Sequence, residues 1–103
     1  MHTDYSRAIP EAWQQIAKVF NALGDEHRQR ILLTFEPGER LTAGQLADVS
    51  TLSRPTVSHH LKILREAGVL EHERHGKEIY FWINKPFMTD ALQSVLTYLQ
   101  DEV

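Results

Sequence analysis

The apolar pattern of this chain changes at Gly68, and that change limits the folds the chain can adopt. Before Gly68, apolar residues recur every three or four positions, as they do in amphipathic helices. After it, residues 69–74 and 77–83 alternate in the manner of two β-strands, and His75–Gly76 between them indicates a hairpin turn. The chain is therefore expected to be mainly α with one small β-hairpin.

Start and stop signals divide the segment before Gly68 into four helices. The first, residues 9–24, has an apolar stripe made of Ile9, Trp13, Ile16, Phe20 and Leu23. Asp25 is placed to cap the second, which runs to about Phe35 and ends before the helix-breaking sequence EPGE. The third and fourth helices are expected within residues 42–68.

These two helices are joined by a very short connection. Thr42 and Gln45 have the spacing of a capping box, and Ser50 to Leu52 form the connection. Ser53 then caps the fourth helix, with Pro55 in its first turn and Gly68 at its end. Followed by a hairpin at residues 69–83 and a helix at residues 86–101, this order predicts a single winged helix-turn-helix domain over residues 1–103, with an extra helix at each terminus.

The fourth helix has two unlike faces. A rotation of about 100° per residue places Val57, Leu61 and Leu64 in one buried stripe, with His60 at its edge and His59 pointing away. The far side consists of Pro55, Ser58, His59, Lys62 and Glu66. We therefore expect His60 to pack against the core and His59 to face outward.

The outward face carries side chains that suit DNA. Arg54, at the start of the helix, has the geometry to donate two hydrogen bonds to guanine O6 and N7, and Ser, Thr and His side chains bind base edges or phosphates. The helix N-terminus also attracts phosphate. The alternative is an ordinary solvated face, but the short turn, the capped partner helix and the following hairpin favour DNA. At the hairpin tip, Arg74, His75 and Lys77 are candidate phosphate contacts, against the alternative of an ordinary charged turn.

Charge is distributed unevenly along the chain. The formal net charge is −3, yet residues 54–77 hold five cations and three anions, whereas the remainder holds six cations and eleven anions. This pattern predicts a basic tip on an acidic body. The acidic total is also the best support for the alternative, a winged-helix module used for protein–protein interaction.

The last helix carries an apolar seam, Met88, Leu92, Val95 and Leu99, at spacings of four, three and four. Such a seam either packs within the chain or forms a dimer interface, since a small domain would otherwise expose an apolar patch. Aromatic residues between the terminal helices could instead line a small-molecule pocket: Trp13, Phe20, Trp82, Phe87 and Tyr98. A role in the core and a dimer interface is the preferred interpretation.

Several other functions are excluded or disfavoured by the sequence. The chain has no cysteine, no glycine-rich phosphate loop and no nucleophile elbow, so no enzyme activity and no cofactor are expected. His72 and His75 should point to opposite faces of their strand, so no metal site is assigned, although a His/carboxylate metal-responsive variant remains an alternative. Without a signal-like N-terminus or a long apolar run, the protein is expected to be soluble and cytoplasmic.

Two segments resemble a known family. FNALGDEHRQRILL and LADVSTLSRPTVSHHLKILREAGVLEHERHGKEIYFWI are similar to the opening helices, helix-turn-helix and wing of the ArsR-type bacterial repressors, over roughly residues 19–84. The resemblance implies a homodimer that represses transcription from a palindromic operator and is released by a signal. The DNA-reading positions of the family fall on Arg54, Pro55, Thr56, Ser58 and His59.

The sensory sites of that family are not matched. Its arsenic, lead and cadmium sensors carry cysteines near the start of the third helix, where this chain has LTAGQ. Its zinc, cobalt and nickel sensors place Asp, His and paired His or Glu along the last helix, which here offers Asp90 but no histidine. The inducing signal is therefore left unidentified. The predicted DNA-binding residues are Ser53, Arg54, Pro55, Thr56, Ser58, His59, Lys62, Arg74, His75 and Lys77. The predicted dimer-interface residues are Trp13, Ile16, Phe20, Met88, Leu92, Val95 and Leu99.

Overall fold

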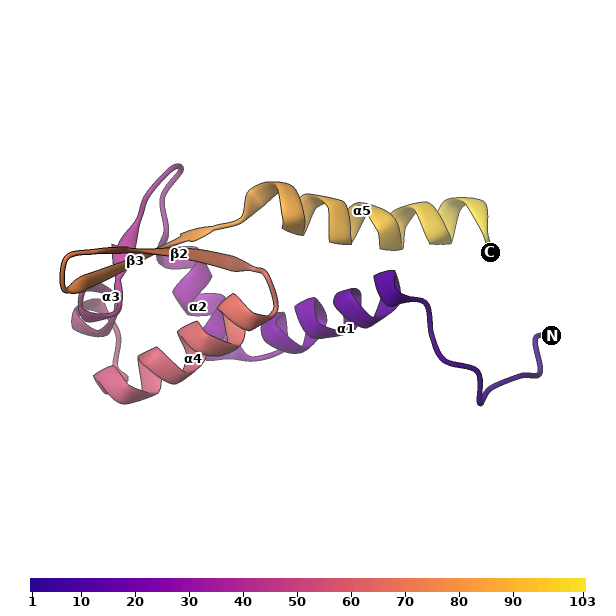
Figure 1. Cartoon of the computed structure of the whole chain (residues 1–103), viewed down its shortest axis with the longest axis horizontal. Helices are drawn as coiled ribbons and strands as arrows, with labels where there is room; N and C mark the ends of the chain where they lie inside the picture. Colours follow the sequence, from indigo (N-terminus) through magenta and orange to yellow (C-terminus); the bar gives the residue numbers. More distant parts are fainter.

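A computed structural model describes all 103 residues as five helices and a three-stranded antiparallel sheet (Figure 1). The elements are α1 (Glu11–Leu23), α2 (Glu26–Thr34), β1 (Leu41–Thr42), α3 (Ala43–Val49), α4 (Arg54–Glu66), β2 (Leu70–His75), β3 (Glu78–Ile83) and α5 (Lys85–Asp101). The molecule is elongated, with extents of 52 × 25 × 24 Å. The hairpin tip, α3 and the start of α4 lie at one end, and both chain termini lie at the other (Figure 1).

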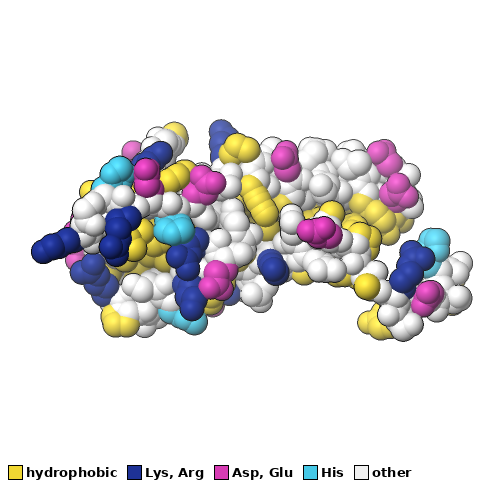
Figure 2. Space-filling view, in the orientation of Figure 1, with side chains coloured by type: hydrophobic (Ala, Val, Ile, Leu, Met, Phe, Trp, Pro, Cys, Tyr) yellow, Lys and Arg dark blue, Asp and Glu magenta, His cyan; other side chains and the backbone are white.

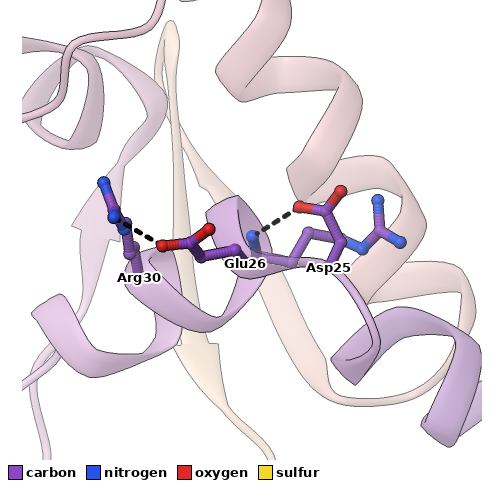
Figure 3. Close-up of polar contacts among 4 residues, drawn as sticks. Asp25, Glu26 and Arg30 are labelled. Atoms are coloured by element: carbon purple, nitrogen blue, oxygen red, sulfur yellow. Dashed lines mark hydrogen bonds and ion pairs between the residues drawn. The ribbon is translucent and has the colours of Figure 1, made fainter.

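The predicted start of α2 is confirmed. The Asp25 carboxylate accepts a hydrogen bond from the backbone N–H of Arg28 at 3.1 Å, and this bond lowers the pKa of Asp25. One turn further along, Arg30 forms an exposed ion pair with Glu26 (Figure 3). The cap satisfies one of the backbone N–H groups that the first turn of a helix leaves without a partner.

The starts of α3 and α4 are also as predicted. In the capping box, the backbone N–H of Gln45 donates to the Thr42 hydroxyl at 3.1 Å, and the backbone N–H of Thr42 donates to the Gln45 side chain at 2.9 Å. The Ser53 hydroxyl accepts from the backbone N–H of Thr56, and Pro55 lies in the first turn of α4. The connection between α3 and α4 is held by the Ser50 hydroxyl, which accepts from the backbone N–H of Leu52.

The buried stripe of α4 forms the centre of the core. Val57, Leu61 and Leu64 are each at most 1% exposed, as the helical periodicity predicts. They belong to a cluster of eleven buried residues that also takes in Val19, Ala22, Ile31, Leu46, Ala67, Val69, Leu70 and Phe81. Because α1, α2, α3 and β2 all pack on α4, the inner face of this helix is fixed from several sides and its outer face is left exposed.

The hairpin differs from the prediction by one residue. His75 pairs with Glu78, so the two-residue loop is Gly76–Lys77 rather than His75–Gly76, and β2 begins at Leu70 rather than Val69. Gly76 has a φ of +62°, which suits the first central position of a tight hairpin turn. A third strand, β1, was not predicted; it has only two residues and pairs Leu41 with Phe81.

Three further details of the sequence predictions are corrected: the start of α1, the place of Trp82 and the start of α5. Helix α1 begins at Glu11, and Ile9 lies outside it, 54% exposed. Trp82 does not lie between the terminal helices, because it is on the outer face of the sheet, where the Arg40 guanidinium stacks on its ring at 3.9 Å. Helix α5 begins one residue early, at Lys85, with Asn84 as its cap.

Gly68 joins the two halves of the fold. It has a φ of +84° and follows α4, and a Cβ placed on it would lie 2.8 Å from the ring of Phe87 in α5. Only glycine accepts both the left-handed backbone and this close approach. Beyond Phe87, α5 contains no buried residue, and no helix of the chain has the length and apolar character needed to cross a membrane.

Candidate nucleic-acid interface

The outward face of α4 is polar, exposed and unobstructed. Every predicted DNA-reading residue on it is exposed: Arg54, Pro55, Thr56, Ser58, His59 and Lys62. The first two turns of the helix lie at the same end of the molecule as the hairpin tip, where Lys and Arg side chains gather (Figures 1 and 2). The structure therefore brings together two groups of candidate residues that are separated by about twenty positions in the sequence.

The N-terminal turn of α4 is held by side-chain contacts. The Ser53 and Thr56 hydroxyls are hydrogen-bonded to each other at 2.9 Å, so the capping serine also orients Thr56. The Arg54 guanidinium lies over Gly44 of α3, 3.7 to 3.8 Å from where a Cβ on that glycine would be. Arg54 makes no ion pair or hydrogen bond within the chain, and its five N–H donors remain available to a ligand.

The adjacent histidines point in different directions, as predicted. His59 is exposed on the outer face of α4, whereas His60 is only 9% exposed and packs against the core. The Arg28 guanidinium lies 3.3 Å from His60 Nδ1. Burial lowers the pKa of His60, and the Arg28 charge adds to this effect while the Asp25 carboxylate opposes it. His60 is therefore a neutral packing residue at physiological pH, and His59 is free to contact a base or phosphate.

The wing carries cations with and without partners. Arg74 and Lys77 are exposed and form no ion pair, which leaves both available for phosphates. His75 is also exposed, but its Nε2 lies 3.4 Å from the Glu73 carboxylate. Arg40 donates to the same carboxylate at 3.1 Å, so Glu73 is held between two basic groups on the outer face of the sheet. This pairing offsets the negative charge that Glu73 would otherwise present on the wing.

Lys62 is the predicted DNA-binding cation on α4 that has an acidic partner within the chain. It lies 3.9 Å from Glu66 one turn later, in an exposed ion pair. Such pairs are worth little in water and are readily exchanged for another anion. Lys62 is therefore expected to reach a phosphate only by leaving Glu66.

The terminal helices present a different surface. Trp13 and Tyr98 meet edge to face at 5.2 Å between α1 and α5, yet large apolar side chains nearby are exposed: Phe20 47%, Leu92 39%, Leu96 50%, Tyr98 41% and Leu99 56%. Apolar side chains are visible along these two helices in Figure 2. Ile16, by contrast, is already 5% exposed in the single chain, and Met88 packs against the core, so both contribute mainly within the protomer.

Some residues of these surfaces could not be found from the sequence. Arg28 contacts His60 across 32 positions and Arg40 contacts Glu73 across 33, and no local pattern indicates either pair. Leu96 could have been found, because Leu92, Leu96 and Leu99 recur at helical spacing. The predicted separation of His72 and His75 is confirmed, since they lie on opposite faces of the hairpin.

Comparisons with known proteins agree with this geometry. A helix-turn-helix domain family model matches residues 23–73. The transcriptional repressor SdpR of Bacillus subtilis is 36% identical over 81 residues, covering 79% of this chain and 89% of the relative. The arsenic resistance transcriptional regulator ArsR1 of Pseudomonas putida is 36% identical over 76 residues, covering 72% of this chain and 59% of the relative.

A solved structure shows the same architecture. The ArsR-like transcriptional regulator from Rhodococcus sp. RHA1 superposes with a TM-score of 0.81 at 25% identity, covering 89% of this chain and 86% of that one. The resemblance predicted from the sequence is thus confirmed. The exposed polar helix, the wing and these likenesses lead to one conclusion: the chain belongs to the ArsR family of winged helix-turn-helix proteins and is a DNA-binding transcriptional repressor, not an enzyme.

Proposed function

We propose that this repressor acts as a homodimer on a palindromic operator and is released by an effector that has yet to be identified. Each protomer inserts α4, the recognition helix, into the major groove. The two grooves are successive and lie about 34 Å apart, which is the spacing of dimeric helix-turn-helix proteins. Each protomer is 52 Å long, which is sufficient for two protomers joined near their terminal helices to reach both grooves.

The exposed residues divide into readers of bases and contacts to the backbone. Arg54, Thr56, Ser58 and His59 face the base edges from the first two turns of α4, with Pro55 adding apolar contact. Ser53, Lys62, Arg74, His75 and Lys77 engage phosphates. Phosphate contacts position the protein and make binding sensitive to salt, whereas base contacts carry the sequence preference.

The observation that carries the proposal is the separation of the two surfaces. The polar outer face of α4 and the wing tip lie at one end of an elongated molecule, and exposed apolar side chains of α1 and α5 lie near the other (Figures 1 and 2). A second copy that covers the apolar surface leaves both reading surfaces free. The proposed dimer interface comprises Trp13, Phe20, Leu92, Val95 and Leu99, and we add Leu96 to it. Ile16 and Met88, which the sequence pattern also assigned to the interface, lie inward and support it from within the protomer.

The test combines selection of DNA with the mass of the complex. Duplexes with a randomised centre are selected by the full chain at low and at moderate salt and sequenced, and sedimentation gives the stoichiometry. We expect an inverted repeat bound by two protomers. Selection of a single, non-repeated site by one protomer would contradict the dimeric mode. Recovery of no preferred sequence by a verified dimer would favour a protein-interaction module instead.

A further inference from the structure

Arg28 connects three helices through one side chain. Its Nε donates to the carbonyl oxygen of Ala22 at 2.8 Å and a terminal nitrogen donates to that of Asn21 at 3.1 Å. These carbonyls belong to the last turn of α1, where a helix leaves its acceptors without partners and carries partial negative charge. The remaining terminal nitrogen lies 3.3 Å from His60 Nδ1 in the recognition helix. Arg28 itself belongs to α2.

The contact with His60 defines the state of that imidazole. A guanidinium can only donate, so Nδ1 must accept, and the ring is neutral with its proton on Nε2. A protonated ring would have no acceptor and would place a second positive charge beside Arg28. The other titratable groups facing the ring are His27 in α2 at 6.0 Å between centroids, His59 in α4 at 5.9 Å, and the Asp25 carboxylate.

The contact between Arg28 and His60 lies close to the residues of α4 that are proposed to read bases, so a change in it would displace them. His60 is next to His59 and six positions after Arg54, which corresponds to about 9 Å along the helix. A tilt of about 10° at His60 therefore moves the start of α4 by more than about 1 Å, which is enough to break a base-specific hydrogen bond. A leucine at position 60 would complete the apolar stripe of α4 without any polar partner, so the presence of histidine calls for a reason beyond packing.

We infer that Arg28 is a positioning residue for the recognition helix: through His60 it holds α4 in one orientation relative to the end of α1, and so sets the distance between the two reading faces of the dimer. The inference rests on the proposed dimeric function and adds a residue to it that touches neither DNA nor the partner. It also makes the link sensitive to protons, because protonation of His60 removes the acceptor.

The experiment uses duplexes selected by the wild-type full chain, in their original form and with one base pair added to or removed from the centre. Two variants of His60 separate the effect of losing the hydrogen-bond acceptor from the effect of changing the size of the side chain. His60→Leu keeps an apolar side chain of similar size but offers no acceptor, whereas His60→Asn places an oxygen close to the position of Nδ1 and does not titrate. The control for Arg28→Gln is Arg30→Gln, because the Arg30 side chain pairs with Glu26 on the same helix and forms no hydrogen bond or ion pair with α1 or α4 (Figure 3).

We expect His60→Leu and Arg28→Gln to bind the original duplex about tenfold more weakly, in line with the loss of a hydrogen bond to a charged group, and to discriminate less between the three spacings. His60→Asn and Arg30→Gln should keep the wild-type spacing preference. Thermal melting of each variant separates these effects from loss of fold.

The pH profile provides a readout that does not depend on His60→Leu folding. Burial lowers the pKa of His60, so wild-type spacing discrimination should decline only as the pH falls below about 6.5, the ordinary histidine value, while that of His60→Asn should not. His59 is present in both proteins, so its own contribution to binding cancels in the comparison. A folded His60→Leu with an unaltered spacing preference, or a His60→Asn that declines like the wild type, overturns the inference. A wild type with no spacing preference would instead overturn the dimeric function on which it rests.

Discussion

The two ends of this molecule expose opposite kinds of surface. At one end, α4 buries its apolar stripe completely and presents an outer face that is polar and charged apart from Pro55, with its N-terminal turn capped. At the other, α5 buries no residue at all and exposes Leu92, Leu96 and Leu99. The first surface is stable in water as it stands and is suited to a charged ligand. The exposed leucines of α5 are unfavourable in water, and covering them with another apolar surface would lower the free energy.

The difference is what one small domain would need in order to bind DNA at one end and a second copy of itself at the other, as we propose. The core under α4 is formed by packing from α1, α2, α3 and β2, so the outer face of α4 is supported from several sides. Helix α1 supplies Val19 and Ala22 to that core, whereas α5 buries no residue and leaves its apolar side chains available for association. Two residues contact the terminal helices from the part of the fold around α4. Gly68, just after α4, packs against Phe87 of α5, and Arg28 of α2 donates a hydrogen bond to the end of α1.

The largest effect is expected at the apolar end. Leu99→Glu places a charge within the proposed interface and should weaken dimerisation about 100-fold or more, because the charge would lose its hydration without gaining a partner. Sedimentation equilibrium measures this, and the melting temperature should change little, since Leu99 is 56% exposed in the single chain. Gln100→Glu adds the same charge to an exposed neighbour and serves as the control. An unchanged dimer in Leu99→Glu would remove α5 from the interface.

The next effect is expected at the junction of the two ends. Gly68→Ala should lower the free energy of unfolding by about 2–3 kcal/mol, because it combines a left-handed backbone with a clash against Phe87. Gly38→Ala is the matched control, since Gly38 has a φ of +74° but no atom within 4 Å of the added Cβ. Chemical denaturation measures both. Equal losses in the two variants would mean that the Phe87 contact contributes nothing.

At the polar end, Arg54→Ala should cost about 1–3 kcal/mol on the selected operator and relax the sequence preference at one base pair. The reason is the loss of a bidentate donor that nothing else in the chain occupies. Fluorescence anisotropy on the operator and on single-base variants tests this, with Arg30→Ala as a control outside the interface. If Arg54→Ala left the operator affinity unchanged, α4 would not be reading DNA through this residue.

The smallest effect is expected at the wing. Lys77→Ala should weaken binding to all duplexes by a similar factor and lower the slope of log affinity against log salt by about one unit, as expected for the loss of one phosphate contact. The exposed Lys85, at the base of α5, provides the control. A Lys77 variant that altered sequence preference without altering the salt slope would assign the wing tip to base reading.

Much of the fold follows from local signals, because helix caps and periodic stripes act over a few residues. Asp25, Thr42 and Ser53 cap the helices they were expected to cap, and Val57, Leu61 and Leu64 are buried together. The exposed face of α4 followed from the same periodicity. The hairpin turn was displaced by one residue because either dipeptide containing Gly76 is a reasonable turn, and only the pairing of β2 with β3 selects one of them.

The tertiary structure decided what depends on residues far apart in the chain. Strand β1 exists because β3 offers it a pairing edge, since two residues have no strand signal of their own. Arg40 reaches Trp82 and Glu73, and Arg28 reaches His60, only because the chain folds back on itself. The sequence by itself determined the helices, the wing and the polar face of α4, because caps and periodicity are local. The tertiary structure decided how this face is joined to the terminal helices. Only in the packed fold does the Arg28 guanidinium contact both the end of α1 and His60 in α4.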